Sequence, residues 1–135
     1  MQPCPCNPEA SYKNCCYPLH ARERKAETPL ELMKSRFSAY AMELPDYIMQ
    51  TTHPKNSYYL SDKAKWKKLI DESYGGVLFK KLEILEHTHN NVEGYVTFKA
   101  TLEKLGQDIS FQERSRFIFE NSNWFYLDGL LNANK

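Results

Sequence analysis

The sequence predicts an α+β fold in which a short cysteine-rich segment precedes a group of helices and then a four-stranded antiparallel sheet. All four cysteines fall within the first 16 residues. Between positions 28 and 75 apolar residues recur at helical spacing, and after position 76 β-branched and aromatic residues follow the period of two that is typical of strands. Because the helices come first and the strands follow together, the pattern favours an α+β fold over an alternating α/β one.

The length and charge of the chain limit what it can be. At 135 residues it has room for one domain of ordinary size and a short appendage. The 18 basic and 17 acidic side chains nearly balance, so nucleic acid is not a favoured partner. No stretch approaches the roughly 18 consecutive apolar residues of a membrane span, and residues 1–4 lack the basic and apolar regions of a secretion signal. We expect a cytoplasmic protein without a membrane partner, and the sequence carries no signal for an oligomeric state.

The cysteines form two pairs, Cys-x-Cys and Cys-Cys, joined by a segment in which Asn7, Pro8 and Glu9 favour a turn. In a reducing compartment such a cluster favours a metal site over disulfides. Zinc takes four tetrahedral ligands, and thiolates suit it well. The sequence therefore predicts one structural zinc ion held by Cys4, Cys6, Cys15 and Cys16.

Two alternatives to this ligand set remain open at the level of sequence. His20 lies close enough along the chain to replace Cys16 as the fourth ligand. The second alternative is that the cysteines are reactive. Either the thiols are free or oxidised, with Cys15 and Cys16 as a redox pair, or zinc is a regulated centre from which Cys15 or Cys16 is released on oxidation.

Three helices are expected after a connection over 17–27, which is charged from Arg22 to Glu27. Thr28-Pro29-Leu30-Glu31 combines an N-cap threonine, a proline at the first helical position and a glutamate placed for a capping box. The apolar face of this amphipathic helix, which Pro45 ends, comprises Met33, Phe37, Tyr40, Ala41 and Leu44. A short helix over 46–51 ends before Pro54. Ser61 is expected to cap a third helix that Gly75-Gly76 ends, with an inward face of Ala64, Leu69, Ile70 and Ser73.

Four strands are expected over 77–87, 92–102, 109–120 and 124–128, separated by residues that favour turns. In the second strand, apolar residues alternate with polar ones, and this pattern predicts one buried face. That face comprises Val92, Val96, Phe98, Ala100 and Leu102. A curved antiparallel sheet wrapped around N-terminal helices looks like the nuclear transport factor two-like fold. That fold is a cone which often encloses a pocket, and it hosts enzymes, binding modules and assembly domains alike.

Several segments carry a more specific resemblance. CPCNPEASYKNCC at 4–16 resembles the SEC-C metal-binding motif at the C-terminus of the SecA translocation ATPase, although residues 7–9 replace its usual Gly-Ser-Gly and lysines are fewer. TPLELMKSRFSAY at 28–40, DYIMQTTHP at 46–54 and ERSRFIFENSNWFYLDG at 113–129 resemble the YchJ family of uncharacterised bacterial proteins. The resemblance implies a zinc knuckle over 1–20, a linker over 21–27 and a nuclear transport factor two-like domain over 28–135. It implies no activity.

The third strand carries the candidate pocket residues. If Phe111 and Phe117 face inward, the period of two places Glu113 and Ser115 on the same face. A buried carboxylate needs a partner, and Arg36 is the candidate. In one interpretation these residues line a small-molecule pocket with Glu113 as a general base. In the other, Glu113 and Arg36 form an internal ion pair and Asp128 ends a strand. The pocket candidates are Arg36, Tyr40, Glu113, Ser115, Trp124 and Asp128, and the expected aromatic wall is Phe111, Phe117, Trp124 and Tyr126.

Other motifs are less informative. His87 and His89 share a strand face but have no evident third metal ligand, and Arg114, Arg116 and Lys99 are best interpreted as a solvated face. No phosphate-binding glycine loop or nucleophile elbow is present in the sequence, which disfavours nucleotide-dependent catalysis. We expect a non-catalytic binding or adaptor protein that recognises a protein partner through the zinc knuckle. The alternative is a small-ligand-binding protein or enzyme that uses the cone pocket around Glu113.

Overall fold

The computed structural model describes residues 2–131, so the last four residues of the predicted 28–135 domain lie outside the described part of the chain. The elements follow in the order β1 (Pro3–Cys4), β2 (Asn7–Ser11), a 3-10 turn η1 (Tyr12–Asn14), α1 (Tyr17–His20), α2 (Pro29–Ala41), α3 (Pro45–Gln50), α4 (Lys63–Tyr74), β3 (Leu78–His89), β4 (Glu93–Lys104), β5 (Gln107–Asp108), β6 (Phe111–Glu120) and β7 (Asn123–Leu131). The predicted order of cysteine segment, helices and strands is confirmed. Within residues 2–131 no helix has the length and apolar character needed to cross a membrane.

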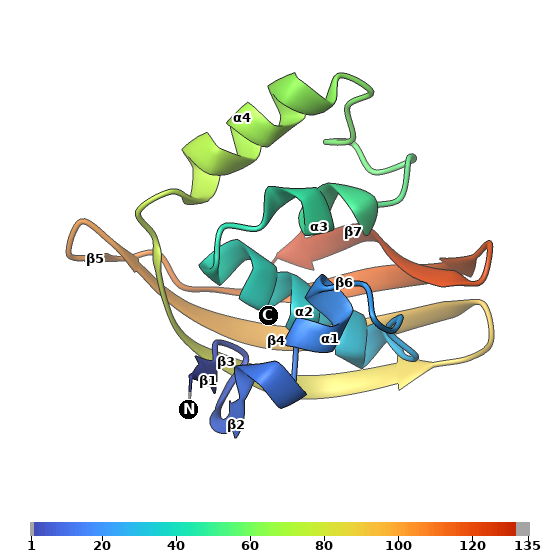
Figure 1. The fold of residues 1–135 in the computed structure, drawn as a ribbon, viewed down its shortest axis with the longest axis horizontal. Helices are drawn as coiled ribbons and strands as arrows, with labels where there is room; N and C mark the ends of the chain where they lie inside the picture. Colours follow the sequence, from blue (N-terminus) through green and yellow to red (C-terminus); the bar gives the residue numbers. More distant parts are fainter. Residues whose placement is uncertain (1, 132–135) are drawn as a thin grey trace.

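The main sheet is antiparallel and follows the order β3-β4-β6-β7, and the short strand β5 pairs with β4. The four long strands curve together, and α2 and α3 lie on one face of the sheet (Figure 1). Helix α4 lies beyond α3, farther from the sheet, and the β1-β2 hairpin lies beside one edge (Figure 1). The predicted curved four-stranded antiparallel sheet is therefore confirmed, with β5 as an addition.

Helix α2 begins where the sequence predicts. The Thr28 hydroxyl accepts a hydrogen bond from the Glu31 N–H at 3.1 Å. The Glu31 carboxylate accepts from the Glu27 N–H at 2.8 Å, one residue before the position that a capping box requires. Because α2 packs against α1, α3 and three strands, it is buried on almost every side, and even polar residues such as Ser35 and Ser38 are inaccessible. The amphipathic interpretation of this helix is therefore too narrow.

Helix α4 departs most from expectation. Its N-cap is Asp62, whose carboxylate accepts from the Lys65 N–H at 3.1 Å, and not Ser61. Trp66 is its buried residue and packs on Tyr59 with ring centroids 4.8 Å apart. Of the predicted inward face, Ile70 is confirmed, because it packs against the cluster of Ala39, Tyr47 and Ile48. The prediction is wrong for the other three residues, because the helix packs on α3 instead of on the sheet and leaves exposed Ala64, Leu69 and Ser73.

The cysteine segment is part of the core. Cys4, Cys6 and Cys16 belong to the same hydrophobic cluster as Phe37 and Phe117. The segment after them, which the sequence assigns to a mere connection, forms the single turn α1 and buries Leu19 in a second cluster with Tyr47 and Ile48. On β4 the inward face is as predicted except for Val92, which lies in the preceding turn and is 61% exposed. The boundaries of knuckle, linker and cone stay predictions.

Candidate metal centre and ligand cavity

The β1-β2 hairpin and the turn before α1 bring the four cysteine sulfurs together. The Sγ atom of Cys6 lies 3.6 Å from Cys4 Sγ, 3.6 Å from Cys15 Sγ and 3.7 Å from Cys16 Sγ, and all four sulfurs lie within 4.8 Å of one another. None of the four forms a disulfide. A zinc ion bonded to four thiolates at about 2.3 Å in a tetrahedron needs sulfurs about 3.8 Å apart. The geometry of this cluster therefore fits a four-thiolate metal site.

Helix α2 supports this cluster from the core side. Cys4 Sγ lies 3.5 Å from Ser38 Oγ, and Cys16 Sγ lies 3.8 Å from the Lys34 carbonyl oxygen. Three of the four cysteines are buried, and Cys15 is half-buried. A metal ion in this cluster would therefore link the N-terminal segment directly to the helix that carries Arg36 and Tyr40.

His20 lies outside the cluster because both of its ring nitrogens are engaged. Nε2 lies 2.8 Å from the Ser35 carbonyl oxygen, which only accepts, so this nitrogen carries the hydrogen. Nδ1 then accepts from the Tyr12 hydroxyl at 2.8 Å. Burial lowers the pKa of His20, while the bond to the Ser35 carbonyl raises it. A neutral ring with both nitrogens in use braces the knuckle and leaves the fourth position to Cys16.

The cysteine thiols differ in acidity, because each acts on the pKa of its neighbours. Hydrogen bonding from Cys16 lowers the pKa of the Cys6 thiol to about 5 against the opposing effect of burial. Burial and the neighbouring Cys6 thiolate raise the pKa of Cys15 to about 12. The hydrogen bond to Cys6, followed by burial, raises the pKa of Cys16. The Cys6 thiolate is thus stabilised by hydrogen bonds from neighbouring thiols. Binding of a divalent cation would convert all four cysteines to thiolates and release protons.

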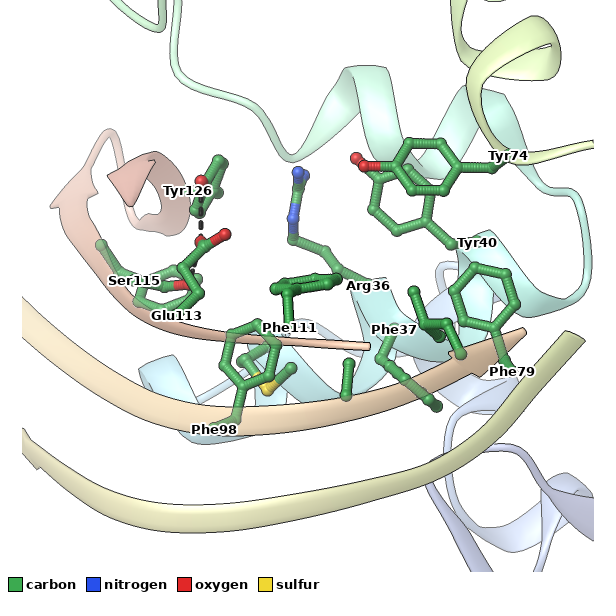
Figure 2. Close-up of a pocket in the computed structure, with 14 residues that line it drawn as sticks. Arg36, Phe37, Tyr40, Tyr74, Phe79, Phe98, Phe111, Glu113, Ser115 and Tyr126 are labelled. Carbon is green, nitrogen blue, oxygen red and sulfur yellow. Dashed lines mark hydrogen bonds between the residues drawn. The ribbon is translucent and has the colours of Figure 1, made fainter. Parts of the chain in front are cut away.

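A cavity opens between α2, α4 and the concave face of the sheet. An inner hollow of about 110 Å³ and an outer one of about 640 Å³ adjoin, and both have walls formed by Arg36, Tyr40, Tyr74, Phe111, Glu113 and Tyr126. The floor of the inner hollow is apolar and comprises Met33, Phe37, Phe79, Phe98, Ala100, Leu102 and Phe117. Figure 2 shows the Arg36 guanidinium rising between Tyr126 on one side and the Tyr40 and Tyr74 rings on the other. The inner hollow is therefore an aromatic pocket with few polar groups, whereas the lining of the outer one also includes Thr52, Asn56, Ser57, Ser73 and Asp128.

Glu113 and Ser115 point into this cavity, as the period of two predicts for β6. Glu113 Oε2 accepts from the Ser115 hydroxyl at 2.6 Å and from the Tyr126 hydroxyl at 3.0 Å (Figure 2). Arg36 instead donates to the Ile48 carbonyl at 3.1 Å and to two threonine hydroxyls in the next turn. The predicted ion pair between Glu113 and Arg36 is therefore wrong, because the turn after α3 supplies nearer acceptors.

Both charges act on the tyrosines that surround them. Burial is the main cause that raises the pKa of Tyr40, Tyr74 and Tyr126; the Glu113 carboxylate raises it further and the Arg36 guanidinium lowers it. The three phenols therefore keep their protons at neutral pH and remain hydrogen-bond donors.

Two predicted pocket residues lie elsewhere or point away. Trp124 is at the far end of β7, where it packs on Phe119 and His89 with ring centroids 5.2 Å and 5.8 Å apart. Asp128 contributes to the rim of the outer hollow, but its carboxylate forms a two-bond ion pair with Arg116, with Nη2 to Oδ2 at 2.6 Å. The cause is a β-bulge, because Arg116 pairs with Asp128 whereas the next residue, Phe117, pairs with Tyr126. Leu127 is therefore an extra residue in β7, and it turns the Asp128 side chain to the outer face of the sheet. Asp128 also does not end its strand, which continues to Leu131.

The remaining candidates form no site in the described part of the chain. His89 packs on Trp124, and the cysteine cluster is the group with metal-binding geometry among residues 2–131. On the outer sheet face, Arg116 also lies 3.8 Å from Glu93, and the Arg114 guanidinium stacks on the Tyr95 ring at 3.8 Å. The expected solvated face is therefore a set of local pairs.

The family follows from comparison with known proteins. A family model described as the YchJ middle NTF2-like domain matches residues 28–129. The chain belongs to the YchJ family. A UPF0225 protein of Vibrio parahaemolyticus is 35% identical over 126 residues, which are 93% of this chain and 73% of the relative. Both the fold class and the family predicted from the sequence are thereby confirmed.

Solved structures of related proteins include the cysteine segment. A SEC-C motif containing protein from Rhodopseudomonas palustris has a TM-score of 0.81 and 31% identity, with 95% of this chain and 97% of that chain covered. A SEC-C motif containing protein from Psychrobacter arcticus has a TM-score of 0.74 and 28% identity, with coverage of 95% and 81%. This YchJ-family chain therefore combines a SEC-C type cysteine cluster with an NTF2-like domain.

The matched YchJ domain contains every residue that lines the inner hollow. Sequence reasoning missed Tyr74, which lines both hollows, and Gly129, which lines the outer one. Tyr74 ends α4 and faces Tyr40 with ring centroids 4.3 Å apart. Gly129 lies against Glu113, and a Cβ atom added there would lie 2.8 Å from the Tyr126 hydroxyl oxygen and closer still to the Glu113 carboxyl. The glycine that follows Asp128 was a signal for close approach on β7, where its lack of a side chain makes room for the carboxyl.

Proposed function

We propose that this YchJ-family protein binds a small organic molecule in the cavity between α2, α4 and the sheet, and that its knuckle holds one structural zinc ion. The observation that carries the first part is the outer hollow of about 640 Å³, which adjoins a second one in the interior of the cone. Pockets for small ligands are typically of this size, mostly apolar, with a few convergent polar groups.

The polar groups support a ligand site more than a structural role. Arg36 is 7% exposed and Glu113 is half-buried, yet the two do not pair with each other. Charged side chains that are removed from water normally find partners of opposite charge. Their separate positions around one aromatic cavity are consistent with a bound molecule between them.

Zinc is the metal that the knuckle suits best. Four cysteine sulfurs at the spacing of a thiolate tetrahedron form a closed site without an open position for substrate. Held by Cys4, Cys6, Cys15 and Cys16, zinc would supply order to a segment with few apolar residues of its own. Recognition of a protein partner by the knuckle stays a prediction. The burial of its sulfurs under α2 leaves for such a contact the exposed start of β2, Asn7 to Glu9, and the exposed residues Lys13, Asn14 and Tyr17.

The test of ligand binding uses two uncharged probes, indole and phenol, added to the zinc-loaded protein. At 15.9 kDa the protein is suited to two-dimensional amide NMR spectra. We expect saturable shifts that concentrate on the cavity walls, at residues such as Phe98, Phe111 and Tyr126. An Ala100→Leu variant fills the inner hollow, because Ala100 lines it and is 1% exposed.

The matched control is Thr101→Leu, which adds the same side chain on the opposite face of β4. Ala100→Leu is expected to weaken binding of both probes, and Thr101→Leu to leave it unchanged. Absence of saturable shifts in the wild type, or shifts that Ala100→Leu leaves intact, would remove the basis of the proposal.

A further inference from the structure

Arg36 has hydrogen-bond donors that residues 2–131 leave unused. A guanidinium has five N–H donors. The hydrogen bonds that Arg36 donates to the described residues leave Nη1 and end on neutral oxygens, at 3.1 Å from Ile48 O, 2.7 Å from Thr51 Oγ1 and 3.0 Å from Thr52 Oγ1. Within residues 2–131, the Arg36 bonds that meet hydrogen-bond geometry leave Nε and Nη2 unused, and no carboxylate lies within ion-pair distance of the side chain. The Tyr40 hydroxyl is the nearest competitor for these donors, since hydrogen bonding with Arg36 is one of the causes that lower the pKa of Tyr40. This cation is 7% exposed and is not neutralised by a described residue.

These free donors face open space. Every fully buried side-chain nitrogen or oxygen among the described residues has a hydrogen-bond partner. The unbonded nitrogens of Arg36 are therefore accessible, and Arg36 lines both hollows of the cavity. Figure 2 shows the end of the side chain between the aromatic rings, pointing away from Phe98 and Phe37. The Tyr126 ring lies 4.6 Å from the guanidinium carbon and fixes its orientation.

A free acceptor faces the same space. Both hydrogen bonds to Glu113 end on Oε2, and Oε1 accepts none from the described residues. Gly129 makes room for this carboxyl against β7. The cavity thus offers a planar cation with free donors and a carboxylate oxygen with free lone pairs, separated by aromatic walls.

We infer that the ligand is a small aromatic carboxylic acid, with its carboxylate on Nε and Nη2 of Arg36 and a hydroxyl or amino group that donates to Glu113 Oε1. The inference rests on the proposed function and names the chemical class of its ligand. A carboxylate matches the planar fork of a guanidinium with two parallel hydrogen bonds. A phosphate dianion fits less well, because Arg36 is the one cation on the cavity wall as described and Glu113 is nearby.

The first test compares benzoate with benzamide by titration calorimetry on the zinc-loaded wild-type protein. The two probes have nearly the same size and shape, but benzamide has no negative charge. Hydrogen bonds to ionised groups are roughly twice as strong as neutral ones, so benzoate is expected to bind about tenfold more tightly. Equal affinities, or tighter binding of benzamide, would overturn the inference.

The second test concerns the acceptor. 3-Hydroxybenzoate and 4-hydroxybenzoate offer a donor at two distances, and at least one is expected to bind severalfold more tightly than benzoate. Glu113→Gln is expected to abolish this advantage while binding of benzoate is retained. If neither hydroxybenzoate exceeds benzoate, or if Glu113→Gln preserves the advantage, the assignment of Glu113 is wrong.

Variants of the cation complete the design. Arg36→Lys keeps the charge and is expected to retain part of the preference for benzoate over benzamide, whereas Arg36→Gln is expected to lose it. Arg114→Gln is the control, since that guanidinium lies on the outer sheet face against Tyr95, and the preference should be unchanged. The comparison in the wild type decides the case even if Arg36→Gln unfolds. Binding of indole and phenol without a preference for acids overturns this inference alone, and failure of every probe overturns the proposed function with it.

Discussion

Removing metal from the knuckle is expected to destabilise the whole domain and not the first 20 residues alone. Cys4, Cys6 and Cys16 are 1%, 7% and 2% exposed and lie in the same core cluster as Phe37 and Phe117. A ligand that binds only the folded state at a thousandfold excess over its dissociation constant adds about 4 kcal/mol to the free energy of unfolding. For a domain of this size that amounts to roughly 12–20 °C in melting temperature.

The assay is thermal unfolding followed by circular dichroism, in buffered zinc and again in excess chelator. A double variant, Cys4→Ser with Cys6→Ser, is measured under the same two conditions. For each protein, the melting temperature in chelator is subtracted from the melting temperature in zinc. This difference cancels the loss of packing that the substitutions cause in both conditions. We expect a large shift in the wild type and almost none in the double variant. A wild-type melting temperature that is indifferent to chelator would refute the reasoning, as would an equal zinc effect in the double variant.

Three further outcomes follow from the cavity and the core. Burial raises the folded-state pKa of Tyr40, Tyr74 and Tyr126 above the ordinary value of 10.0. The stability that these protonated phenols contribute is therefore complete below about pH 10 and is lost as the pH rises through their folded-state pKa values. Urea unfolding should show a free energy of unfolding that falls above about pH 10, and a flat profile would contradict this. Gly129→Ala is expected to displace the Glu113 carboxyl and to lower the free energy of unfolding in urea by about 1–3 kcal/mol. The preference for hydroxybenzoates should be lost as well. Unchanged stability would contradict the close approach of Gly129 to the Glu113 carboxyl. Phe117→Ala should cost about 3–5 kcal/mol because the ring is fully buried. Phe119→Ala, whose residue lies on the same strand face but is 40% exposed, should cost much less, and similar losses would contradict the difference in burial.

Much of the architecture was predictable because it depends on local signals. The N-cap Thr28 and the adjacent proline fix the start of α2, and the period of two on β6 correctly places Glu113 and Ser115 on one face. The clustering of the four cysteine sulfurs was predictable for a related reason, since two cysteine pairs so close along the chain have few other ways to pack.

The predictions were wrong where contacts between residues distant in the sequence determine which way a side chain points and which partner it has. No local signal in the sequence marks Leu127 as the extra residue of a bulge, yet this residue turns Asp128 to the outer face. Arg36 was matched with Glu113 on the basis of charge, whereas the turn after α3 presents two threonine hydroxyls and a carbonyl at shorter range. The face of α4 depends on its packing against α3, which helical periodicity alone does not reveal.

The central claim is that a carboxylate ligand binds the Arg36 guanidinium. The most direct test follows the side-chain Nε–H resonance of Arg36 by NMR while the arginine-labelled protein is titrated with benzoate. We predict a saturable downfield shift of this one resonance with the affinity that calorimetry gives, while the resonances of Arg22 and Arg114 stay in place. An Arg36 resonance that does not move while benzoate binds, or shifts confined to surface arginines, would contradict the account.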